Sequence, residues 1–446
     1  MANPYLPGWE YIPDGEPRVF GDRVYIYGSH DKAGSGRFCD TVLKVWSASI
    51  HDLDHWQCHG VSFRMKDDAK GCSDIDWDAQ ELFAPDVVCH RGKYYLFAYL
   101  FYAKGCVAVS DHPEGPFTLL GQYEVPEDMP EIAQAGVLVD PGVLVDDDGK
   151  VYIYCGFEHS YFAQLDPDRL TRLLPGTFVD QEDFLPQIPA KEECFYEACS
   201  PRKVGDTYYM IYSPRVGSRL AYATSDSPVG PWKYRGYIVD NGVDYPAGNN
   251  HGSICEINGQ WYIFYHRMTN DTIMSRRGCV ERITILPDGT IPPVEMTSLG
   301  FQDALNPYEA TPADIACVLK GKGYITEYTP FDRRIVGITD GTVLGYKYYD
   351  FGDDYTSETM DISISLDSCG SSGIIEVLAD SDGEDGMLLG TLTYSHLDTC
   401  IFGTLKGLSG RHAIYLRFKG DDKILWPDVF AKDRVLASLK AFVFMK

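Results

Sequence analysis

The sequence predicts an all-β protein, with a five-bladed β-propeller over residues 1–300 and a jelly-roll-like β-sandwich over residues 307–446. Three observations support this prediction: a repeated turn-and-strand motif, a composition rich in Tyr, Gly and Pro, and a change of pattern near residue 307. The 446 residues include 31 Tyr, 43 Gly and 26 Pro. Such a composition suits many short strands joined by tight turns.

A turn containing glycine and followed by a Tyr-rich strand occurs five times. Its glycines are spaced by 71, 57, 56 and 54 residues and are Gly21, Gly92, Gly149, Gly205 and Gly259. Each copy reads as a two-residue hairpin turn that leads into an alternating strand. A unit of about 55 residues with several antiparallel strands has the size of one propeller blade, so five units predict five blades.

A second motif follows the repeat in register. The segment Ser110-Asp-His-Pro-Glu-Gly-Pro-Phe recurs as Ser225-Asp-Ser-Pro-Val-Gly-Pro-Trp, where a third strand and its exit loop would lie. Beyond residue 307 the pattern changes to short alternating segments such as Ile374-Ile-Glu-Val-Leu, separated by polar turn clusters. This pattern is typical of a β-sandwich, and helices are expected to be rare throughout.

The charge balance excludes two classes of partner. The chain has 39 Lys and Arg against 65 Asp and Glu, a formal net charge of −26. Such a field repels nucleic acids and anionic membranes, so neither is expected to bind. No apolar run reaches the roughly 18 residues of a spanning helix, and no signal peptide is visible. The 13 Cys lack C-x-x-C pairs and read as reduced thiols, so a cytoplasmic protein is expected, with secretion left open for a trimmed chain.

Four carboxylates and one histidine stand just before the five turn glycines, where the innermost strand of each blade would begin. They precede the glycine by 7, 6, 9, 8 and 8 residues and are Asp14, Asp86, Asp140, Glu197 and His251. In a propeller these strand starts converge on the central channel at one face. Each residue alone is an ordinary turn or strand-end residue, but their common position in the repeat favours one shared pocket. Burying several carboxylates together costs free energy unless they are paired or have a function, so such a pocket indicates a functional site.

Taken in order, these motifs resemble glycoside hydrolase family 43, whose members are five-bladed propellers. The resemblance covers residues 3 to 300 and rests on Asn3-Pro4, Pro13-Asp14, Ala84-Pro85-Asp86, Val139-Asp140-Pro141-Gly142, Phe195 to Lys203 and Asn250-His251-Gly252.

The resemblance implies that Asp14 is the general base, Glu197 the general acid and Asp140 the residue that tunes the acid. It implies that the chemistry requires no cofactor. His251 matches a position near the channel axis that in many members helps to hold a calcium ion or water, so a structural Ca²⁺ is a further expectation. The segment Gly15-Glu-Pro17 departs from relatives that have Pro directly after the Asp, which weakens the transfer of substrate identity more than that of mechanism.

The positions of Asp14 and Glu197 also fit glycoside hydrolysis with inversion when the resemblance is set aside. Inversion needs an acid and a base on opposite sides of the sugar, about 6.5–9.5 Å apart. Asp14 and Glu197 belong to blades that lie across a five-fold channel rather than side by side. A charged Asp140 and the aromatic neighbours of Glu197 would raise the pKa of Glu197 and keep it protonated.

We therefore expect an inverting exo-glycosidase that hydrolyses terminal pentose residues of plant or microbial polysaccharides. An α-L-arabinofuranosidase or a β-xylosidase fits best, and a β-D-galactofuranosidase is a narrower alternative in the same class. A sugar-binding propeller that no longer cleaves is the rival from another class, disfavoured because both base and acid are present. A metal-dependent hydrolase lacks its usual His-x-His or His-Glu-x-x-His spacing.

Substrate contacts are expected from five residues: Trp77, Phe83, Asp86, Phe195 and Arg277. Trp77 and Phe83 offer stacking rings, although a Trp packed within a surface loop explains Trp77 equally well. Arg276 and Arg277 are adjacent, and one of them resembles the substrate-binding arginine of the family. Neighbouring residues of a strand face opposite sides, so both cannot point inward, and Arg277 is favoured.

The C-terminal region resembles carbohydrate-binding module family 6, through Asp340-Gly-Thr-Val-Leu-Gly-Tyr346 and Leu408-Ser-Gly-Arg-His-Ala-Ile-Tyr-Leu-Arg-Phe418. Such modules often hold a sugar between a Tyr and a Trp. Tyr346 matches the first ring, but Phe402 stands where the Trp is expected. Packing against the propeller is therefore favoured over sugar binding for this domain.

Overall fold

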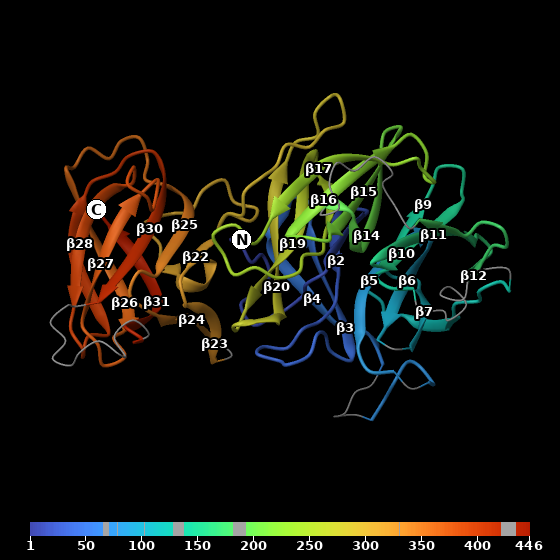
Figure 1. Ribbon diagram of the computed structural model, residues 1–446, viewed down its shortest axis with the longest axis horizontal. Helices are drawn as coiled ribbons and strands as arrows, with labels where there is room; N and C mark the ends of the chain where they lie inside the picture. Colours follow the sequence, from blue (N-terminus) through green and yellow to red (C-terminus); the bar gives the residue numbers. More distant parts are fainter. Residues whose placement is uncertain are drawn as a thin grey trace.

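The computed structural model describes residues 1–65, 71–77, 79–101, 103–127, 138–181, 193–329, 331–420 and 434–446. These residues form two β bodies side by side, with the propeller on the right of Figure 1 and the sandwich on the left. Among the described elements the one helical piece is a single 3-10 turn, η2 (Ala313–Ile315). The expected all-β class is confirmed.

The propeller consists of five antiparallel sheets taken in chain order, with neighbouring strands paired within each sheet. The first two sheets contain β1 (Glu16–Phe20), β2 (Arg23–Tyr27), β3 (Val42–Ser49), β4 (Asp52–Arg64), and then β5 (Leu82–His90), β6 (Lys93–Leu100), β7 (Ala103–Ser110) and β8 (Thr118–Gln122). The third contains β9 (Gly142–Val145), β10 (Val151–Phe157), β11 (His159–Asp166), β12 (Arg169–Leu173) and the short β13 (Val179–Gln181). The last two contain β14 (Phe195–Val204), β15 (Thr207–Pro214), β16 (Arg219–Ser225), β17 (Lys233–Asp240), and then β18 (Ser253–Ile257), β19 (Gln260–Thr269) and β20 (Thr272–Ile283).

The first strand of each sheet lies innermost. β1 contacts β5 and β18, β5 contacts β9, and β9 contacts β14, so these strands surround the axis. The N-terminal segment runs beside β20, where the Tyr5 backbone N–H donates to Gly278 O and the Val280 N–H donates to Asn3 Oδ1. The start of the chain thus completes the three-stranded fifth blade and carries Asp14 toward the axis.

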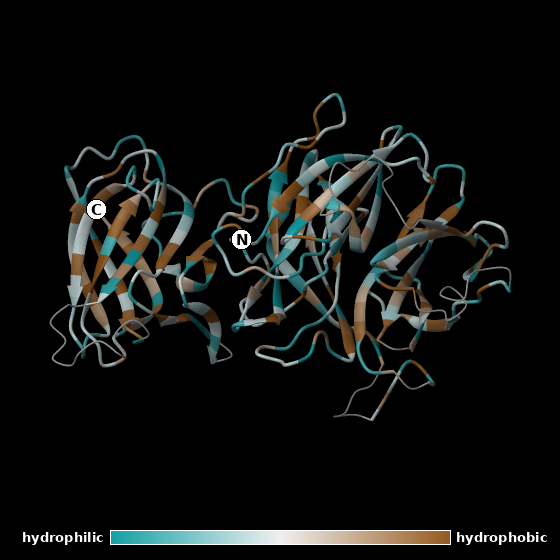
Figure 2. Ribbon diagram, viewed as in Figure 1, coloured by the Kyte–Doolittle hydropathy of each residue, from teal (hydrophilic) through white to brown (hydrophobic). Residues whose placement is uncertain are grey.

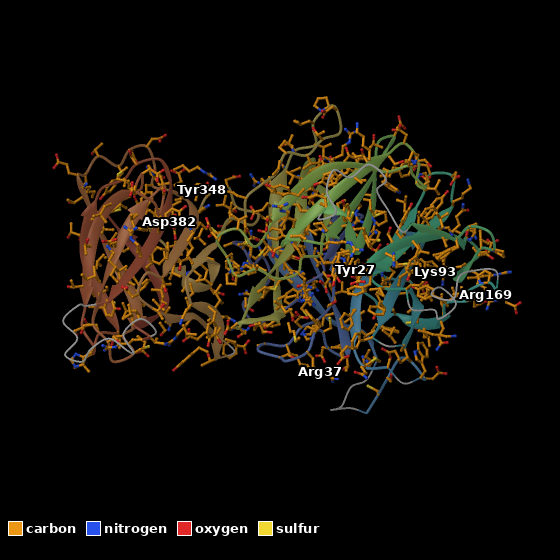
Figure 3. All side chains as sticks on the ribbon, viewed as in Figure 1. Tyr27, Arg37, Lys93, Arg169, Tyr348 and Asp382 are labelled. Carbon is orange, nitrogen blue, oxygen red and sulfur yellow. The ribbon has the colours of Figure 1, made fainter. Side chains whose placement is uncertain are left out.

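The two repeated sequence motifs meet between neighbouring blades. The hydroxyl of Tyr27, labelled in Figure 3, donates a 2.6 Å hydrogen bond to Pro113 O in the exit loop of the second blade. The Tyr154 hydroxyl donates in the same way to Pro228 O of the fourth blade. Because each buried tyrosine needs a partner for its hydroxyl, the Tyr-rich strand and the Ser-Asp-x-Pro loop recur together.

The sandwich consists of two sheets. One has the order β23 (Tyr324–Thr329), β24 (Asp332–Ile338), β31 (Ala437–Met445), β26 (Thr359–Asp367) and β29 (Cys400–Lys406), with β21 (Thr311–Pro312) beside β31. The other has the order β22 (Val318–Lys320), β25 (Val343–Asp350), β30 (Arg411–Gly420), β27 (Gly373–Ala379) and β28 (Met387–Tyr394). Hydrophobic residues alternate with polar ones along these strands (Figure 2), as expected when one face of each sheet is buried.

The two bodies share one apolar core. A continuous cluster of buried residues runs from Tyr209, Tyr222 and Ile263 of the propeller to Ile315 and Phe442 of the sandwich. The fully buried guanidinium of Arg267 donates to the carbonyls of Asp314 and Ala316 in the sandwich. This interface supports the expected packing role of the C-terminal domain.

The expected ring pair of a family 6 binding module does not form. Tyr346 is fully buried, packs against Phe442 and donates its hydroxyl to Ala313 O. Phe402 is 70% exposed on β29, which belongs to the other sheet. The likeness to that module family is therefore not confirmed.

Candidate active site

Strained backbone marks the start of several innermost strands. Asp14, Asp140 and Ala198 have φ angles of 55°, 49° and 69°, in the left-handed region that non-glycine residues rarely adopt. The residue before Ala198, Glu197, also lies at an irregularity in the pairing of β14 with β15. Such strain and such bulges persist where the surrounding structure holds them, and they gather at functional sites. Here they occur at or directly beside the three predicted catalytic carboxylates.

Asp14 is held from three sides. Its Oδ1 accepts a 2.7 Å hydrogen bond from Arg276 Nη1, and its Oδ2 accepts one of 2.7 Å from Ser29 Oγ. Its backbone N–H donates to Nδ1 of His266. The side chain is 3% exposed, so its orientation is fixed.

These contacts keep Asp14 ionised. Burial alone would raise its pKa, but the charges of Arg276 and His251 reverse that effect and lower the pKa to about 2. His266 is different, because burial and the nearby Arg276 lower its pKa to about 3 and leave it neutral. A carboxylate held charged at neutral pH is what a general base requires.

His251 joins Asp14 to Asp140. Its Nδ1 lies 3.8 Å from Asp14 Oδ1 and 3.9 Å from Asp140 Oδ2. Glu16 and the two aspartates outweigh the effect of burial and raise the pKa of His251 to about 9, so the ring is positively charged. One imidazolium therefore stands between two of the three predicted catalytic residues.

Glu197 has the opposite electrostatics to Asp14. Burial and then the charge of Asp140 raise its pKa to about 8, and the charge of Asp14 acts in the same direction. Burial also raises the pKa of Asp140, to about 6. Glu197 belongs to β14 and Asp140 precedes β9, and these strands come close because Gly142 has no side chain: a Cβ there would lie 2.1 Å from Cys199 O. At neutral pH the site therefore holds a charged Asp14 and a protonated Glu197.

The expectation that Arg277 faces this pocket is wrong. Arg277 pairs with Asp314 of the sandwich at 3.0 Å, whereas Arg276 contacts Asp14 and binds Asp31 through Nε and Nη2. Because side chains alternate along β20, Arg276 and Arg277 face opposite sides of the strand. Arg276 faces Asp14, whereas Arg277 faces the C-terminal domain, whose buried Asp314 neutralises it. The Phe38 ring lies 5.0 Å from the Arg276 guanidinium and further fixes it.

Two other expected substrate contacts are also corrected. Asp86 is fully buried, and both of its oxygens accept hydrogen bonds from Arg18, so it has no face left for a sugar. Phe195 is 3% exposed and packs against Tyr212 within the fourth blade. Asp86 shares the register of the catalytic residues but is paired with Arg18 from β1.

Trp77 and Phe83 remain predictions as substrate contacts. Trp77 is half-buried and packs against the apolar cluster between the first two blades, which favours the packing explanation. Phe83 is also half-buried and stacks on Phe101, and it precedes Ala84, whose N–H donates to the same Ser29 hydroxyl that binds Asp14. Phe83 therefore lies close to the base.

The axis beneath His251 does not fit a calcium ion. Calcium prefers six to eight oxygen ligands, but the carboxylates here are already paired, Asp86 with Arg18 and Glu16 with Arg202 at 2.6 Å each. His251 offers a charged imidazole 3.9 Å from Glu16. Among the described residues, no cluster of three or more His, Cys, Asp or Glu is placed to hold a metal. The guanidiniums of Arg18 and Arg202 supply the positive charge that a calcium ion would otherwise provide.

Four residues of the site were not foreseen: Glu16, Ser29, Asp31 and His266. Arg276 was the alternative to Arg277 in the sequence analysis. Ser29 and Asp31 directly follow β2, whose C-terminal end lies at the same face as Asp14. In each blade the turn glycine reverses the chain, so the end of the second strand returns to the face where the first strand begins. The residues that follow each second strand could therefore have been predicted as site candidates. His266 lies within β19, the second strand of the fifth blade, and no sequence signal singled it out.

A propeller pocket with one charged and one protonated carboxyl group has the chemistry of a glycoside hydrolase. The family model for glycosyl hydrolases family 43 matches residues 2–291. A xylosidase/arabinosidase from Thermoclostridium stercorarium is 37% identical, over 94% of this chain and 96% of that protein. A β-xylosidase from Xylanibacter ruminicola is 30% identical over 66% of this chain and its own full length. The chain belongs to glycosyl hydrolase family 43.

Solved structures agree with this assignment. A family 43 β-xylosidase/α-arabinofuranosidase from a compost metagenome, in its calcium-free form with xylotriose, is 27% identical with a TM-score of 0.53, over 65% of this chain and 96% of that one. A family 43 arabinoxylan arabinofuranohydrolase from Bacillus subtilis, bound to cellotetraose, has a TM-score of 0.55 and covers all of this chain and 97% of that one. At 23% identity the second shows the shared fold of both bodies.

Proposed function

We propose that the protein is an inverting exo-glycosidase that releases terminal pentose residues from a neutral polysaccharide, as an α-L-arabinofuranosidase, a β-xylosidase or both. The observation that carries the proposal is the opposite pKa shift of Asp14 and Glu197, two carboxyl groups that lie close enough for the charge of Asp14 to act on Glu197. Relatives described as xylosidase/arabinosidase and β-xylosidase support the sugar class. The net charge of −26 favours a neutral substrate over an acidic one.

In the proposed reaction Asp14 takes a proton from a water molecule while the oxygen of that water attacks the anomeric carbon. Glu197 gives its proton to the glycosidic oxygen as the bond from that oxygen to the anomeric carbon breaks. Arg276 and Ser29 keep the Asp14 carboxylate in place through both of its oxygens. The water and the leaving group occupy opposite faces of the sugar, so the anomeric configuration inverts.

The sugar specificity is tested with aryl glycosides. We expect release from p-nitrophenyl α-L-arabinofuranoside or β-D-xylopyranoside to exceed that from the β-D-galactofuranoside, which is the alternative within the same class. No release from any of these glycosides would instead support a sugar-binding propeller without catalysis.

The charge of Asp140 sets the upper limit of the active pH range. Glu197 acts while protonated, so activity should fall as the pH rises through the Glu197 pKa of about 8. Asp140→Asn removes a negative charge that raises this pKa, so the basic limb of the kcat profile should move to lower pH. A pH series on an aryl glycoside measures the shift. A basic limb unchanged from that of the native enzyme would show that Asp140 does not tune the acid.

We further propose that neither catalysis nor folding depends on calcium, because Arg18 and Arg202 already neutralise the axial carboxylates. Dialysis against EDTA, followed by addition of CaCl₂, should leave both kcat and Tm unchanged. A drop in either that calcium restores would contradict this proposal. The variant Arg202→Met should lower Tm, because it removes the guanidinium that pairs with the buried Glu16 at 2.6 Å.

In the described part of the chain, no helix has the length and apolar character needed to cross a membrane. None of the 13 cysteines, all of which lie in described parts of the chain, forms a disulfide. The cytoplasmic location stays a prediction.

A further inference from the structure

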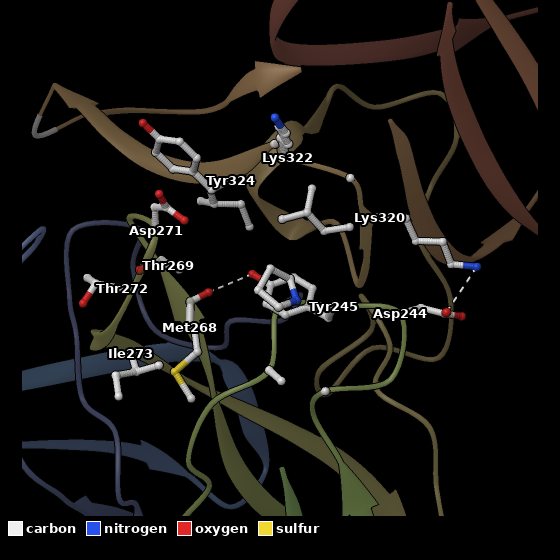
Figure 4. Close-up of a pocket in the computed structure, with 17 residues that line it drawn as sticks. Asp244, Tyr245, Met268, Thr269, Asp271, Thr272, Ile273, Lys320, Lys322 and Tyr324 are labelled. Carbon is white, nitrogen blue, oxygen red and sulfur yellow. Dashed lines mark hydrogen bonds and ion pairs between the residues drawn. The ribbon is translucent and has the colours of Figure 1, made fainter. Parts of the chain in front are cut away.

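A large cleft lies between the fifth blade and the sandwich. It has a volume of about 820 Å³ and is drawn in Figure 4. Its propeller side consists of the loop 242–247 and the β19–β20 hairpin, and its sandwich side consists of residues 319–325. Ligand sites of this size are frequent where two domains meet.

The propeller side of the cleft is built from the same loops as the catalytic pocket. The loop 242–247 continues into Asn249, whose backbone carbonyl accepts a hydrogen bond from Nε2 of His266. The hairpin continues along β20 to Arg276. The Tyr245 hydroxyl donates to Met268 O at 2.9 Å and ties the loop to the hairpin, as Figure 4 shows. The segments that line the cleft therefore also carry residues that contact the catalytic site.

The lining combines ring, aliphatic and hydrogen-bonding groups. Tyr324 is half-buried with its ring beside Gly337, where a Cβ would lie 3.5 Å away, and Ile273 is 43% exposed. Asp271, at the hairpin tip, is exposed and has no hydrogen bond or ion pair with any described residue. Lys320 is paired with Asp244 at 3.1 Å, so charges of both signs meet in the cleft.

This lining matches a neutral carbohydrate. A sugar ring presents C–H groups that pack on tyrosine and isoleucine, and hydroxyls that donate to a free carboxylate such as Asp271. Two lysines and two aspartates line the cleft, Lys320, Lys322, Asp244 and Asp271, so a polyanion would find no excess of positive charge there within a strongly acidic protein. We propose that the cleft is a second saccharide site, which holds a neighbouring stretch of the neutral polysaccharide whose side chains enter the catalytic pocket. The inference rests on the proposed function for the identity of that polymer.

The test compares ring removal inside and outside the cleft. Tyr324→Ala and Asp271→Ala alter the cleft, whereas Tyr328→Ala removes a ring from the same strand, β23, at a 59% exposed position beside Arg334. Affinity for neutral arabinoxylan is measured by retardation in native gels, and kinetics are measured on arabinoxylan and on an aryl glycoside. Thermal unfolding of the three variants checks that each is folded.

Both cleft variants should lose affinity for arabinoxylan, by about tenfold for Tyr324→Ala, as expected when one stacking contact is lost. Their KM on the polymer should rise while kcat on the aryl glycoside stays unchanged, and Tyr328→Ala should behave as the native protein. Equal retardation of all four proteins, or an equal loss in all three variants, would overturn the proposal. Stronger retardation by polygalacturonate than by arabinoxylan would also overturn it. Gel retardation does not require turnover, so failure of the proposed catalytic function is detected separately, by the aryl glycoside assay of the native protein.

Discussion

Replacing Asp14 by asparagine is expected to lower kcat by on the order of 10²–10⁴-fold, the usual contribution of a general base. The loss should be the same for an aryl glycoside and an oligosaccharide, because water must be activated whatever group leaves. Asparagine keeps the shape of the side chain: its amide oxygen can accept from Arg276 in the place of Oδ1, and its NH₂ group can donate to the Ser29 hydroxyl in the place of Oδ2. Steady-state rates on both substrates measure the effect.

Rescue by azide separates a missing base from a distorted pocket. Azide is a small anionic nucleophile that needs no deprotonation, so it should restore part of the activity of Asp14→Asn on the aryl substrate. It should not accelerate the native enzyme. Near-normal activity of Asp14→Asn on both substrates would refute the assignment, and Asp86 is a poor replacement because it is buried against Arg18.

Replacing Glu197 by glutamine should give a loss that depends on the leaving group. With an oligosaccharide the departing oxygen needs a proton, so kcat should fall by on the order of 10²–10⁴-fold. With an activated aryl group the oxygen leaves with little help, so the loss should be much smaller. The basic limb near pH 8 should also disappear, because the group that titrates there has been removed.

Rates of Glu197→Gln on a series of aryl glycosides with different leaving-group pKa values give the sharpest readout. We expect a steeper dependence of log kcat on leaving-group pKa than in the native enzyme. An equal loss on every substrate would mean that Glu197 supports the structure of the pocket instead of protonating the leaving group.

The repeat made most of this site predictable. Hairpin glycines at nearly constant spacing fix where each innermost strand begins, and this brings Asp14, Asp140 and Glu197 to one face without any knowledge of tertiary contacts. The same logic misassigned Asp86, since its partner Arg18 belongs to the neighbouring innermost strand β1, 68 residues earlier in the chain. The position of a residue in the repeat predicts that it lies near the axis, but it does not predict which oppositely charged side chain pairs with it there.

The arginine pair shows a second limit. Alternation along β20 requires Arg276 and Arg277 to face opposite sides, but the sequence does not say which side is the pocket. That choice depends on Asp31 after β2 and on Asp314 in the C-terminal domain, both far away in the chain. Phe195 was misassigned for a related reason, because its ring belongs to the buried core between the third and fourth blades.

The anomeric configuration of the first product tests the central claim most directly. Proton NMR of the initial reaction mixture, recorded before mutarotation, shows which anomer the enzyme releases. With Asp14 as base and Glu197 as acid, an α-L-arabinofuranoside should give β-L-arabinofuranose first, and a β-D-xyloside should give α-D-xylose first. Initial release of a product with the configuration of the substrate would contradict the account, because retention requires a carboxylate that attacks the sugar itself.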